Sequence, residues 1–362
     1  MAPERVLSIQ SHVVFGYVGG KAAVFPLQCL GYDVDIAELR THKVVNTVNF
    51  SNHAGYGRSG GSRTTAAELN SIFESMEQNE LLMPSRLLTG YIPGAEALSA
   101  VEKLATKLKH AKPSLTYLLD PVMGDAGRLY VAADVIPVYQ DMLPLATIIT
   151  PNWFEAEVLT GIELKDFPSL RKALSILHLK YHVPNVVITS ILMKPWLIAA
   201  LPPSIRPPDD DHLLCITSST TATHPTSRSD FESCPSIVHA QCVPTIPGYF
   251  SGVGDLFSAL LLAHFHPGRP PTTSDTTPLS EAVFQALAKT HTLLQLTHEQ
   301  AMSLPEEERL ATDDELDSVD PLRRTRRMRG RELALIQGQD IIRGSALDDT
   351  RSLVAWDGFW SQ

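Results

Sequence analysis

Apolar residues in the first half of the chain follow two alternating spacings. Short apolar runs such as Val6–Ile9 and Leu87–Ile92 predict buried strands, whereas apolar residues at helical spacing from Ala97 to Leu108 predict a helix. The alternation of strands and helices predicts an α/β fold with a mostly parallel sheet and helices on both faces. Ligands bind at the carboxyl ends of the strands of such a sheet, so we expect the site among the polar residues that follow each strand.

The second half of the chain is less regular. Residues rich in Pro, Ser, Thr and Asp predict a mobile insertion over 202–236. It contains a possible strand at His212–Thr217 and is followed by another at Ile237–Val243. A strong apolar pattern then predicts a helix over Asp255–Phe265. We expect one domain that spans 1–362 and carries surface insertions.

Charged residues gather in the segment 304–332, which we expect to be flexible. The chain is acidic from Glu306 to Asp320 and basic from Arg323 to Arg331. An arginine cluster can bind nucleic acid, but a solvated helix paired with the neighbouring acidic stretch is the favoured interpretation.

Composition narrows the class of protein. The 362 residues are 44% hydrophobic, enough for a large core, and the formal net charge of −10 gives no global attraction for nucleic acid or acidic membranes. The four cysteines form no CxxC pair, which fits a reducing compartment. No apolar stretch approaches the roughly 20 residues that span a bilayer, and no signal peptide is visible. We expect a cytoplasmic protein, which can also be nuclear, with neither nucleic acid nor membrane as a partner.

The strongest local signal is Gly252-Val253-Gly254-Asp255 before an apolar helix. The glycines let the backbone turn tightly, and a helix N-terminus offers free N–H groups to an anion such as a phosphoryl group. Asp255 lies in the first turn, where its carboxylate can accept a proton from a hydroxyl. The alternative interpretation is an ordinary helix cap after a glycine turn.

Two further segments place carboxylates after predicted strands. Asp120 ends a strand, Gly124 allows close approach of the backbone to a ligand, and Asp125 adds a second carboxylate, a pairing that suits Mg²⁺ near phosphates. A turn with solvated aspartates is the alternative. Asn152 and Glu155, three residues apart at a helix start, can position water on a metal, or they can form a capping box.

The N-terminal glycine-rich segment differs from both common nucleotide-binding motifs. Ser11 lies at the predicted sheet edge, but the spacing up to Lys21 is one residue short of a Walker A loop, and the segment lacks GxGxxG. The segments Phe50–Tyr56 and Thr89–Tyr91 also follow strands and add groups suited to a flat heteroaromatic ring. We expect His53 to be a hydrogen-bonded structural residue.

Taken together and in this order, these segments resemble the pyridoxal kinases of the ribokinase-like superfamily, over about residues 5 to 300. The runs that carry the resemblance are SIQSHVVFGYVG, FSNHAGYG, LTGY, DPVMGD, TPNWFEAEVLTG, VVITS and GVGDLFSALLLAHF. The resemblance implies a three-layer α/β/α fold, a homodimer, and phosphorylation of the 5′-hydroxymethyl group of pyridoxal, pyridoxine or pyridoxamine. ATP with Mg²⁺ or another divalent metal, and often K⁺, would be required.

The resemblance also implies roles for individual residues. Asp255 would be the base on the 5′-hydroxyl, with Gly252 and Gly254 framing an anion hole. The metal would be held by Asp120, Asp125 and Glu155. The nucleotide would be contacted by Asp125, Thr150, Asn152, Thr189, Ser190 and Val253, and the vitamin pocket would be lined by Ser11, Val18, Val48, Phe50 and Tyr91.

Some positions depart from the family pattern. Ala54 and Val253 stand where the family often has threonine, and 38–45 reads as an insertion. These changes put rate and acceptor choice in question more than the fold. The nearest rival is a hydroxymethylpyrimidine kinase of the same superfamily, although the SNHxGYG run and Tyr91 favour pyridoxal. A rival of another class is a non-catalytic nucleotide or pyridoxal-phosphate binding protein, which would not need the base.

Overall fold

The computed structural model describes residues 4–35, 45–209, 211–220, 236–310, 312–344 and 353–361. The expected insertion at 38–45 falls almost entirely outside these ranges. The insertion expected over 202–236 is described at 202–209, 211–220 and 236, and the strand expected at His212–Thr217 is present as part of a longer strand, His212–Thr220.

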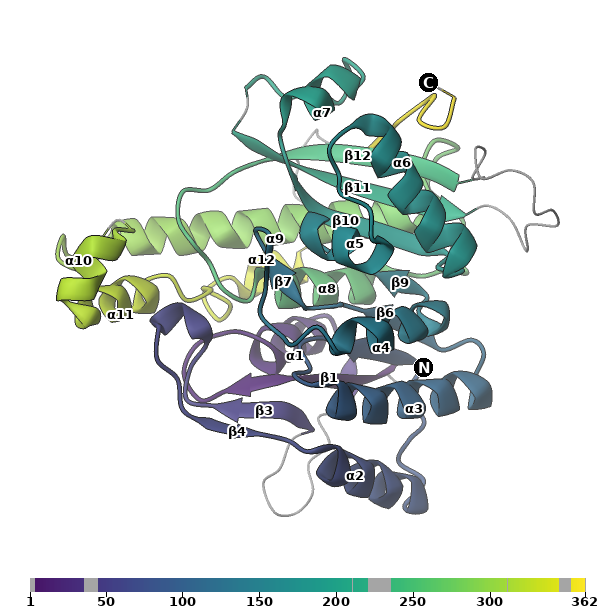
Figure 1. The fold of residues 1–362 in the computed structure, drawn as a ribbon, viewed down its shortest axis with the longest axis horizontal. Helices are drawn as coiled ribbons and strands as arrows, with labels where there is room; N and C mark the ends of the chain where they lie inside the picture. Colours follow the sequence, from purple (N-terminus) through teal and green to yellow (C-terminus); the bar gives the residue numbers. More distant parts are fainter. Residues whose placement is uncertain are drawn as a thin grey trace.

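A mixed sheet of 11 strands runs through the molecule (Figure 1), in the order β13-β12-β11-β10-β9-β6-β5-β1-β3-β4, with β2 also paired to β1. Strands β1, β2, β3, β5, β6, β9 and β10 pair in parallel, while β4, β11, β12 and β13 pair antiparallel at the two edges. The strands are β1 (Arg5–Val13), β2 (Asp33–Asp35), β3 (Asn46–Phe50), β4 (Gly61–Arg63), β5 (Arg86–Thr89), β6 (Thr116–Leu119), β9 (Ile148–Ile149), β10 (Asn185–Leu192), β11 (His212–Thr220), β12 (Ser236–Pro244) and β13 (Val354–Ala355). A separate hairpin joins β7 (Gly124–Asp125) to β8 (Arg128–Leu129).

Helices cover both faces of the sheet, so the predicted three-layer α/β/α fold is confirmed. One face packs against α2 (Ala66–Gln78), α3 (Ala95–Ala111), α4 (Val135–Met142), α5 (Trp153–Thr160), α6 (Phe167–Ser175) and α7 (Pro195–Ala200). The other packs against α1 (Gly20–Cys29), α8 (Val253–His264), α9 (Pro278–Met302) and α12 (Gln339–Arg343). Short turns are η1 (Ala54–Tyr56), η2 (Leu143–Leu145) and a π-helical turn (Ile176–Lys180).

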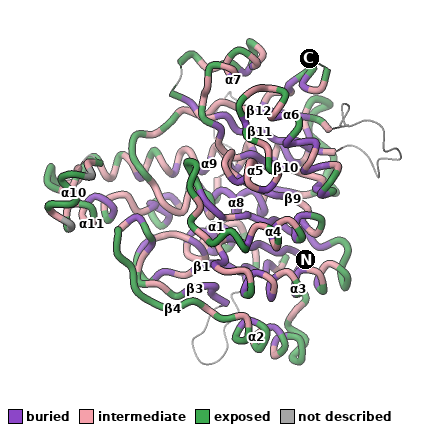
Figure 2. The backbone as a smooth tube through the Cα atoms, viewed as in Figure 1, coloured by how far each residue is buried: buried purple, intermediate pink, exposed green. Residues whose placement is uncertain are grey.

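The central strands are apolar on both sides because both of their faces are covered. In β5, Leu87 belongs to the core under α2–α7 and its neighbour Leu88 to the core under α8 and α9. Successive side chains of a strand point to opposite faces, so an unbroken apolar run is what a doubly covered strand requires. Figure 2 shows the result as buried backbone through the middle of the molecule.

Helix α8 is buried along most of its length, between the sheet, α1 and α9. Its last turn is held by Arg86 of β5, whose Nη1 donates hydrogen bonds to the carbonyls of Leu262 (2.7 Å) and Phe265 (2.8 Å). A guanidinium at this end satisfies orphan carbonyls and complements the negative end of the helix dipole. Arg86 thus anchors the C-terminal end of α8.

The charged segment forms two helices, α10 (Asp314–Val319) and α11 (Pro321–Arg329), beyond one end of the sheet. Asp317 accepts hydrogen bonds from Arg323 and Arg327, and Asp320 pairs with Arg326. The expected pairing of the arginines with neighbouring acidic residues is present, but Arg323 and Arg327 are 12% and 5% exposed and are therefore largely buried rather than solvated. Within the described residues, no helix combines the length and the apolar character needed to cross a membrane.

Candidate active site

A cavity of about 720 Å³ opens at the carboxyl ends of the parallel strands and at the N-terminus of α8. Most of the residues predicted for the site lie on its wall. They are Ser11, Val18, Tyr91, Asp120, Gly124, Asp125, Thr150, Asn152, Glu155, Thr189, Ser190, Gly252, Val253, Gly254 and Asp255. Val48 and Phe50 are not on the wall, and Val48 in β3 is buried with 1% exposure.

Gly252 and Gly254 play different parts at the start of α8. Gly252 has a φ of 81°, and a Cβ there would lie 2.1 Å from the carbonyl oxygen of Tyr17, so both its conformation and its surroundings require glycine. Gly254 lies within the helix, has no positive φ, and a Cβ there would meet nothing nearer than Oδ2 of Asp120 at 3.8 Å. Gly254 therefore leaves open space in front of the helix N-terminus.

Asp255 is held by the glycine-rich segment that follows β1. The backbone N–H of Gly19 donates a 2.7 Å hydrogen bond to its Oδ2. Burial raises the pKa of Asp255 to about 6, and the Gly19 hydrogen bond limits the rise. The group is mostly a carboxylate at neutral pH, and its pKa is close enough to neutrality to suit a general base.

Asp120 follows β6 and lies deeper, with 5% exposure. Ser258, one turn after Asp255 on α8, donates a 3.1 Å hydrogen bond to Oδ2 of Asp120, and its hydroxyl is also 3.1 Å from that of Thr150. Burial, followed by the charges of Glu155 and Asp255, raises the pKa of Asp120 well above its ordinary value. The charges of Glu155 and Asp255 thus disfavour the ionised form of Asp120.

Glu155 and Asn152 form a capping box at the start of α5, as one of the two interpretations of this pair predicted. A capping box does not exclude a role at a metal. Oε1 of Glu155 also accepts hydrogen bonds from the N–H groups of Met123 (2.8 Å) and Gly124 (3.3 Å). Burial raises the pKa of Glu155 to about 7 in spite of these bonds. The carboxylate fixes the backbone between β6 and the β7–β8 hairpin, where Asp125 is exposed.

A second hydrogen-bond cluster, which includes the wall residue His53, centres on Glu332. Its carboxylate accepts hydrogen bonds from the N–H of Tyr17 (2.8 Å), from Nε2 of His53 (2.9 Å) and from the hydroxyl of Tyr56 (2.7 Å). His53 lines the cavity, and its Nδ1 is 3.2 Å from Oγ of Ser251. The expectation that His53 is a hydrogen-bonded residue agrees with these contacts.

Several wall residues were not predicted from the sequence. Ser258 could have been found, because it lies three residues after Asp255 and so shares its face of the helix. The loop between β12 and α8 offered no pattern. The other unpredicted polar and aromatic wall residues include His53, Tyr130, Tyr249, Ser251, Thr290 and His291.

The wall is rich in carboxylates and lacks cationic side chains. Among the described residues, no Lys or Arg lines the cavity, and no three His, Cys, Asp or Glu side chains come together as a ready-made metal cluster. Positive potential for an anion therefore comes from the first N–H groups of α8, which have no partner within the helix.

Comparison with known proteins gives concordant results. Residues 66–195 match the family model described as phosphomethylpyrimidine kinase. A pyridoxal kinase from Arabidopsis thaliana is 38% identical over 287 residues, which cover 79% of this chain and 81% of that protein. A pyridoxal kinase from Homo sapiens is 36% identical over 270 residues, 73% of this chain and 78% of that protein. A solved structure of pyridoxal kinase from Leishmania donovani in complex with ADP and pyridoxamine covers 97% of this chain and 98% of that chain, with a TM-score of 0.73 and 30% identity.

Proposed function

Because this chain belongs to the pyridoxal kinase family, we infer that it is an enzyme that transfers the terminal phosphoryl group of ATP to the 5′-hydroxymethyl group of pyridoxal, pyridoxine and pyridoxamine. One observation carries the chemistry: Asp255 lies in the first turn of α8, inside the cavity and beside N–H groups that have no helical partner. A proton acceptor and an anion site thus share one place.

We propose that Asp255 takes the proton of the acceptor hydroxyl. As that O–H bond breaks, the oxygen forms a bond to the terminal phosphorus, and the bond from phosphorus to the bridging oxygen breaks to release ADP. The N–H groups at the start of α8 face the charge that develops on the phosphoryl oxygens. Gly254 keeps this space free, and Gly252 permits the turn that exposes the N–H groups.

The two substrates would occupy different parts of the wall. We assign the vitamin to the side of Ser11, Val18 and Tyr91, because Val18 adjoins Gly19, whose N–H group binds Asp255. The nucleotide would lie along the strand ends that carry Thr150, Asn152, Thr189 and Ser190, with Asp125 and the backbone of Val253 near its phosphates. These assignments rest on the shared cavity and on the resemblance of the motifs.

A divalent metal fits the charge balance of the site. ATP would bring several negative charges to a wall that offers carboxylates and, among the described residues, no Lys or Arg. Mg²⁺ commonly binds through one or two carboxylates together with phosphates and water, so it needs no ready-made cluster of three side chains. Asp120, Asp125 and Glu155 would hold it, directly or through water, and it would neutralise charge on the transferred group. We propose K⁺ as an activator on the resemblance alone.

The assembly and compartment are part of the same proposal. We propose a homodimer on the resemblance to the family alone, and a cytoplasmic location, which fits the acidic composition and the absence of an apolar run of spanning length. Sedimentation of the purified full chain at several concentrations would test the dimer.

The test of the function is an acceptor panel with the purified full chain. ATP, Mg²⁺ and K⁺ are supplied with pyridoxal, pyridoxine, pyridoxamine or hydroxymethylpyrimidine, and both ADP and the phosphorylated product are measured. We expect pyridoxal phosphate with ADP formed in equal amount. Phosphorylation of hydroxymethylpyrimidine alone would establish the rival kinase, and binding without ADP formation would establish a non-catalytic protein.

A further inference from the structure

Glu332 lies 67 residues after Phe265, the end of the last recognisable motif, yet it contacts the segments that build the acceptor end of the cavity. Its side chain is 12% exposed. Oε2 accepts from the N–H of Tyr17, while Oε1 accepts from His53 and Tyr56. Burial raises the pKa of Glu332, but the hydrogen bonds from His53, Tyr56 and Tyr17 outweigh burial and hold that pKa below its ordinary value. Glu332 is therefore a charged acceptor for three donors.

His53 connects Glu332 to Ser251, which lies just before the N-terminus of α8. The N–H of Gly55 points at Nδ1 of His53 at 3.2 Å, and a backbone N–H can only donate. Nδ1 is therefore the acceptor, so Nε2 carries the proton that His53 donates to Glu332. The hydroxyl of Ser251, immediately before Gly252, is 3.2 Å from the same Nδ1. The orientation of the imidazole is thus set from both sides.

The glycine-rich segment is held at three points. The N–H of Tyr17 binds Glu332, the carbonyl of Tyr17 lies against Gly252, and the N–H of Gly19 binds Asp255. At Gly16, with a φ of 97°, an added Cβ would lie 2.6 Å from Oε1 of Glu332. The carboxylate of Glu332 therefore fills the space that a side chain at position 16 would occupy.

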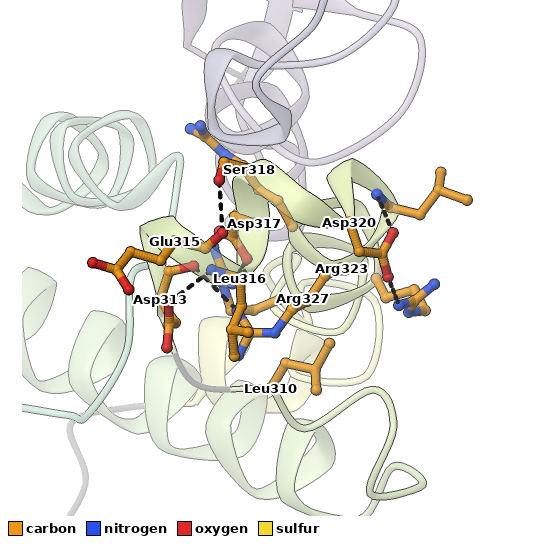
Figure 3. A network of polar contacts seen from close by, with 12 residues as sticks. Leu310, Asp313, Glu315, Leu316, Asp317, Ser318, Asp320, Arg323 and Arg327 are labelled. Atoms are coloured by element: carbon orange, nitrogen blue, oxygen red, sulfur yellow. Dashed lines mark hydrogen bonds and ion pairs between the residues drawn. The ribbon is translucent and has the colours of Figure 1, made fainter.

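The helices that precede Glu332 are themselves braced. Figure 3 shows Asp317 of α10 between Arg323 and Arg327 of α11, with hydrogen bonds of 2.6 Å and 2.9 Å to its Oδ1. From the same helix, Nε of Arg324 donates a 2.7 Å hydrogen bond to the carbonyl of Gly55, which is on the cavity wall. The segment that presents Glu332 is thus anchored to the acceptor side of the cavity.

We propose that Glu332 is a positioning residue for the acceptor: it fixes the glycine-rich segment that holds Asp255 and the turn that carries His53. The inference rests on the proposed function, because its readout is the phosphorylation of an acceptor. Glu332 touches neither the reacting atoms nor the strand ends assigned to the nucleotide, so its removal should affect the acceptor more than ATP.

Glu332→Gln tests this positioning role, because glutamine has nearly the same size and shape as glutamate. A glutamine side chain has one accepting oxygen and one donating NH₂ group, so it cannot accept from Tyr17 on one side and from His53 and Tyr56 on the other. One set of donors is left without an acceptor. Since hydrogen bonds to charged groups are among the stronger ones, we expect kcat/KM for pyridoxal to fall roughly tenfold or more, with the KM for ATP within about twofold of wild type.

Two matched variants separate this effect from general damage. Glu308→Gln removes another carboxylate of the same region, paired with Arg329 at 3.5 Å and not on the wall of the main cavity, and should leave both KM values unchanged. Tyr56→Phe removes only one of the three donors and should give a smaller loss than Glu332→Gln. Calorimetry on the full chain should show weaker pyridoxal binding to Glu332→Gln and unchanged ADP binding.

Wild-type kinetics and pyridoxal binding in Glu332→Gln would overturn the proposal. Equal losses for pyridoxal and ADP, together with a lower melting temperature, would also overturn it, since they would indicate general structural support. If wild-type protein phosphorylates hydroxymethylpyrimidine and no B6 vitamer, the proposed function fails instead, and the same measurements with that acceptor decide the role of Glu332. If it phosphorylates neither, calorimetric pyridoxal binding to the two glutamine variants still decides it.

Discussion

The backbone N–H of Gly19 donates a 2.7 Å hydrogen bond to Oδ2 of Asp255, across 236 positions of the chain. The bond joins the turn after the first strand to the first turn of α8. It also adjusts the acidity of the carboxylate, because burial raises the pKa of Asp255 and the N–H group opposes the rise. The resulting pKa of about 6 leaves Asp255 ionised at neutral pH and still able to accept a proton.

Asp255→Asn should abolish most turnover while ATP affinity stays nearly unchanged. Asparagine keeps the size of the side chain and can still accept from Gly19, but it cannot take the proton of the acceptor hydroxyl. General-base catalysis contributes roughly 10² to 10⁴ in rate, so a loss of that order is expected in kcat. Steady-state kinetics with calorimetric ATP binding measures both. A variant with near wild-type kcat would remove Asp255 from the mechanism.

Alanine at Gly252 should destabilise the fold, whereas alanine at Gly254 should not. At Gly252 the positive φ and the Tyr17 carbonyl at 2.1 Å oppose any Cβ, so we expect a loss of about 1–3 kcal/mol or more in the free energy of unfolding. Gly254 has helical surroundings with no close contact, so Gly254→Ala should fold with unchanged stability and lose activity by filling the phosphoryl space. Urea denaturation and kinetics separate the two. A destabilised Gly254→Ala would contradict this assignment.

Asp120→Asn should stabilise the unliganded protein at alkaline pH. The folded pKa of Asp120 is raised by burial and by Glu155 and Asp255, whereas the unfolded value is about 3.9. A carboxyl group whose pKa is raised in the folded state makes the protein less stable as the pH rises through that pKa. An asparagine at the same position does not ionise, so the variant does not lose this stability. Melting scans should show a gain of a few degrees at pH 8 that shrinks toward pH 4, together with loss of activity. A variant that melts lower at every pH would show that the charge of Asp120 is compensated.

Removal of divalent metal should abolish phosphoryl transfer and spare the fold. The cavity wall offers no Lys or Arg among the described residues, so the charge of ATP lacks a side-chain counter-ion there. Treatment with a chelator should remove nearly all turnover, and Mg²⁺ or Mn²⁺ should restore it while the melting temperature changes little. Full turnover after exhaustive chelation would contradict the assignment of Asp120, Asp125 and Glu155 to a metal.

The sequence allowed the prediction of residues that follow strands, because parallel strands bring their carboxyl ends to one edge whatever the chain between them does. Asp120 and Thr150 are examples, and both lie on the cavity wall. Glu332 could not be found in this way, because it follows a short helix and belongs to no periodic pattern. The contrast between Gly252 and Gly254 was equally hidden, since it depends on a carbonyl that approaches from a distant turn.

Arg86 holds the end of α8 that lies away from Asp255. Its guanidinium binds the carbonyls of Leu262 and Phe265, which lie seven and ten residues after Asp255, or roughly 10 and 15 Å along the helix axis at 1.5 Å per residue. Protein interiors are close-packed and transmit strain, so we expect a disturbance at Arg86 to reach Asp255 through the buried helix. Substitution of Arg86, which is not on the cavity wall, should therefore lower activity.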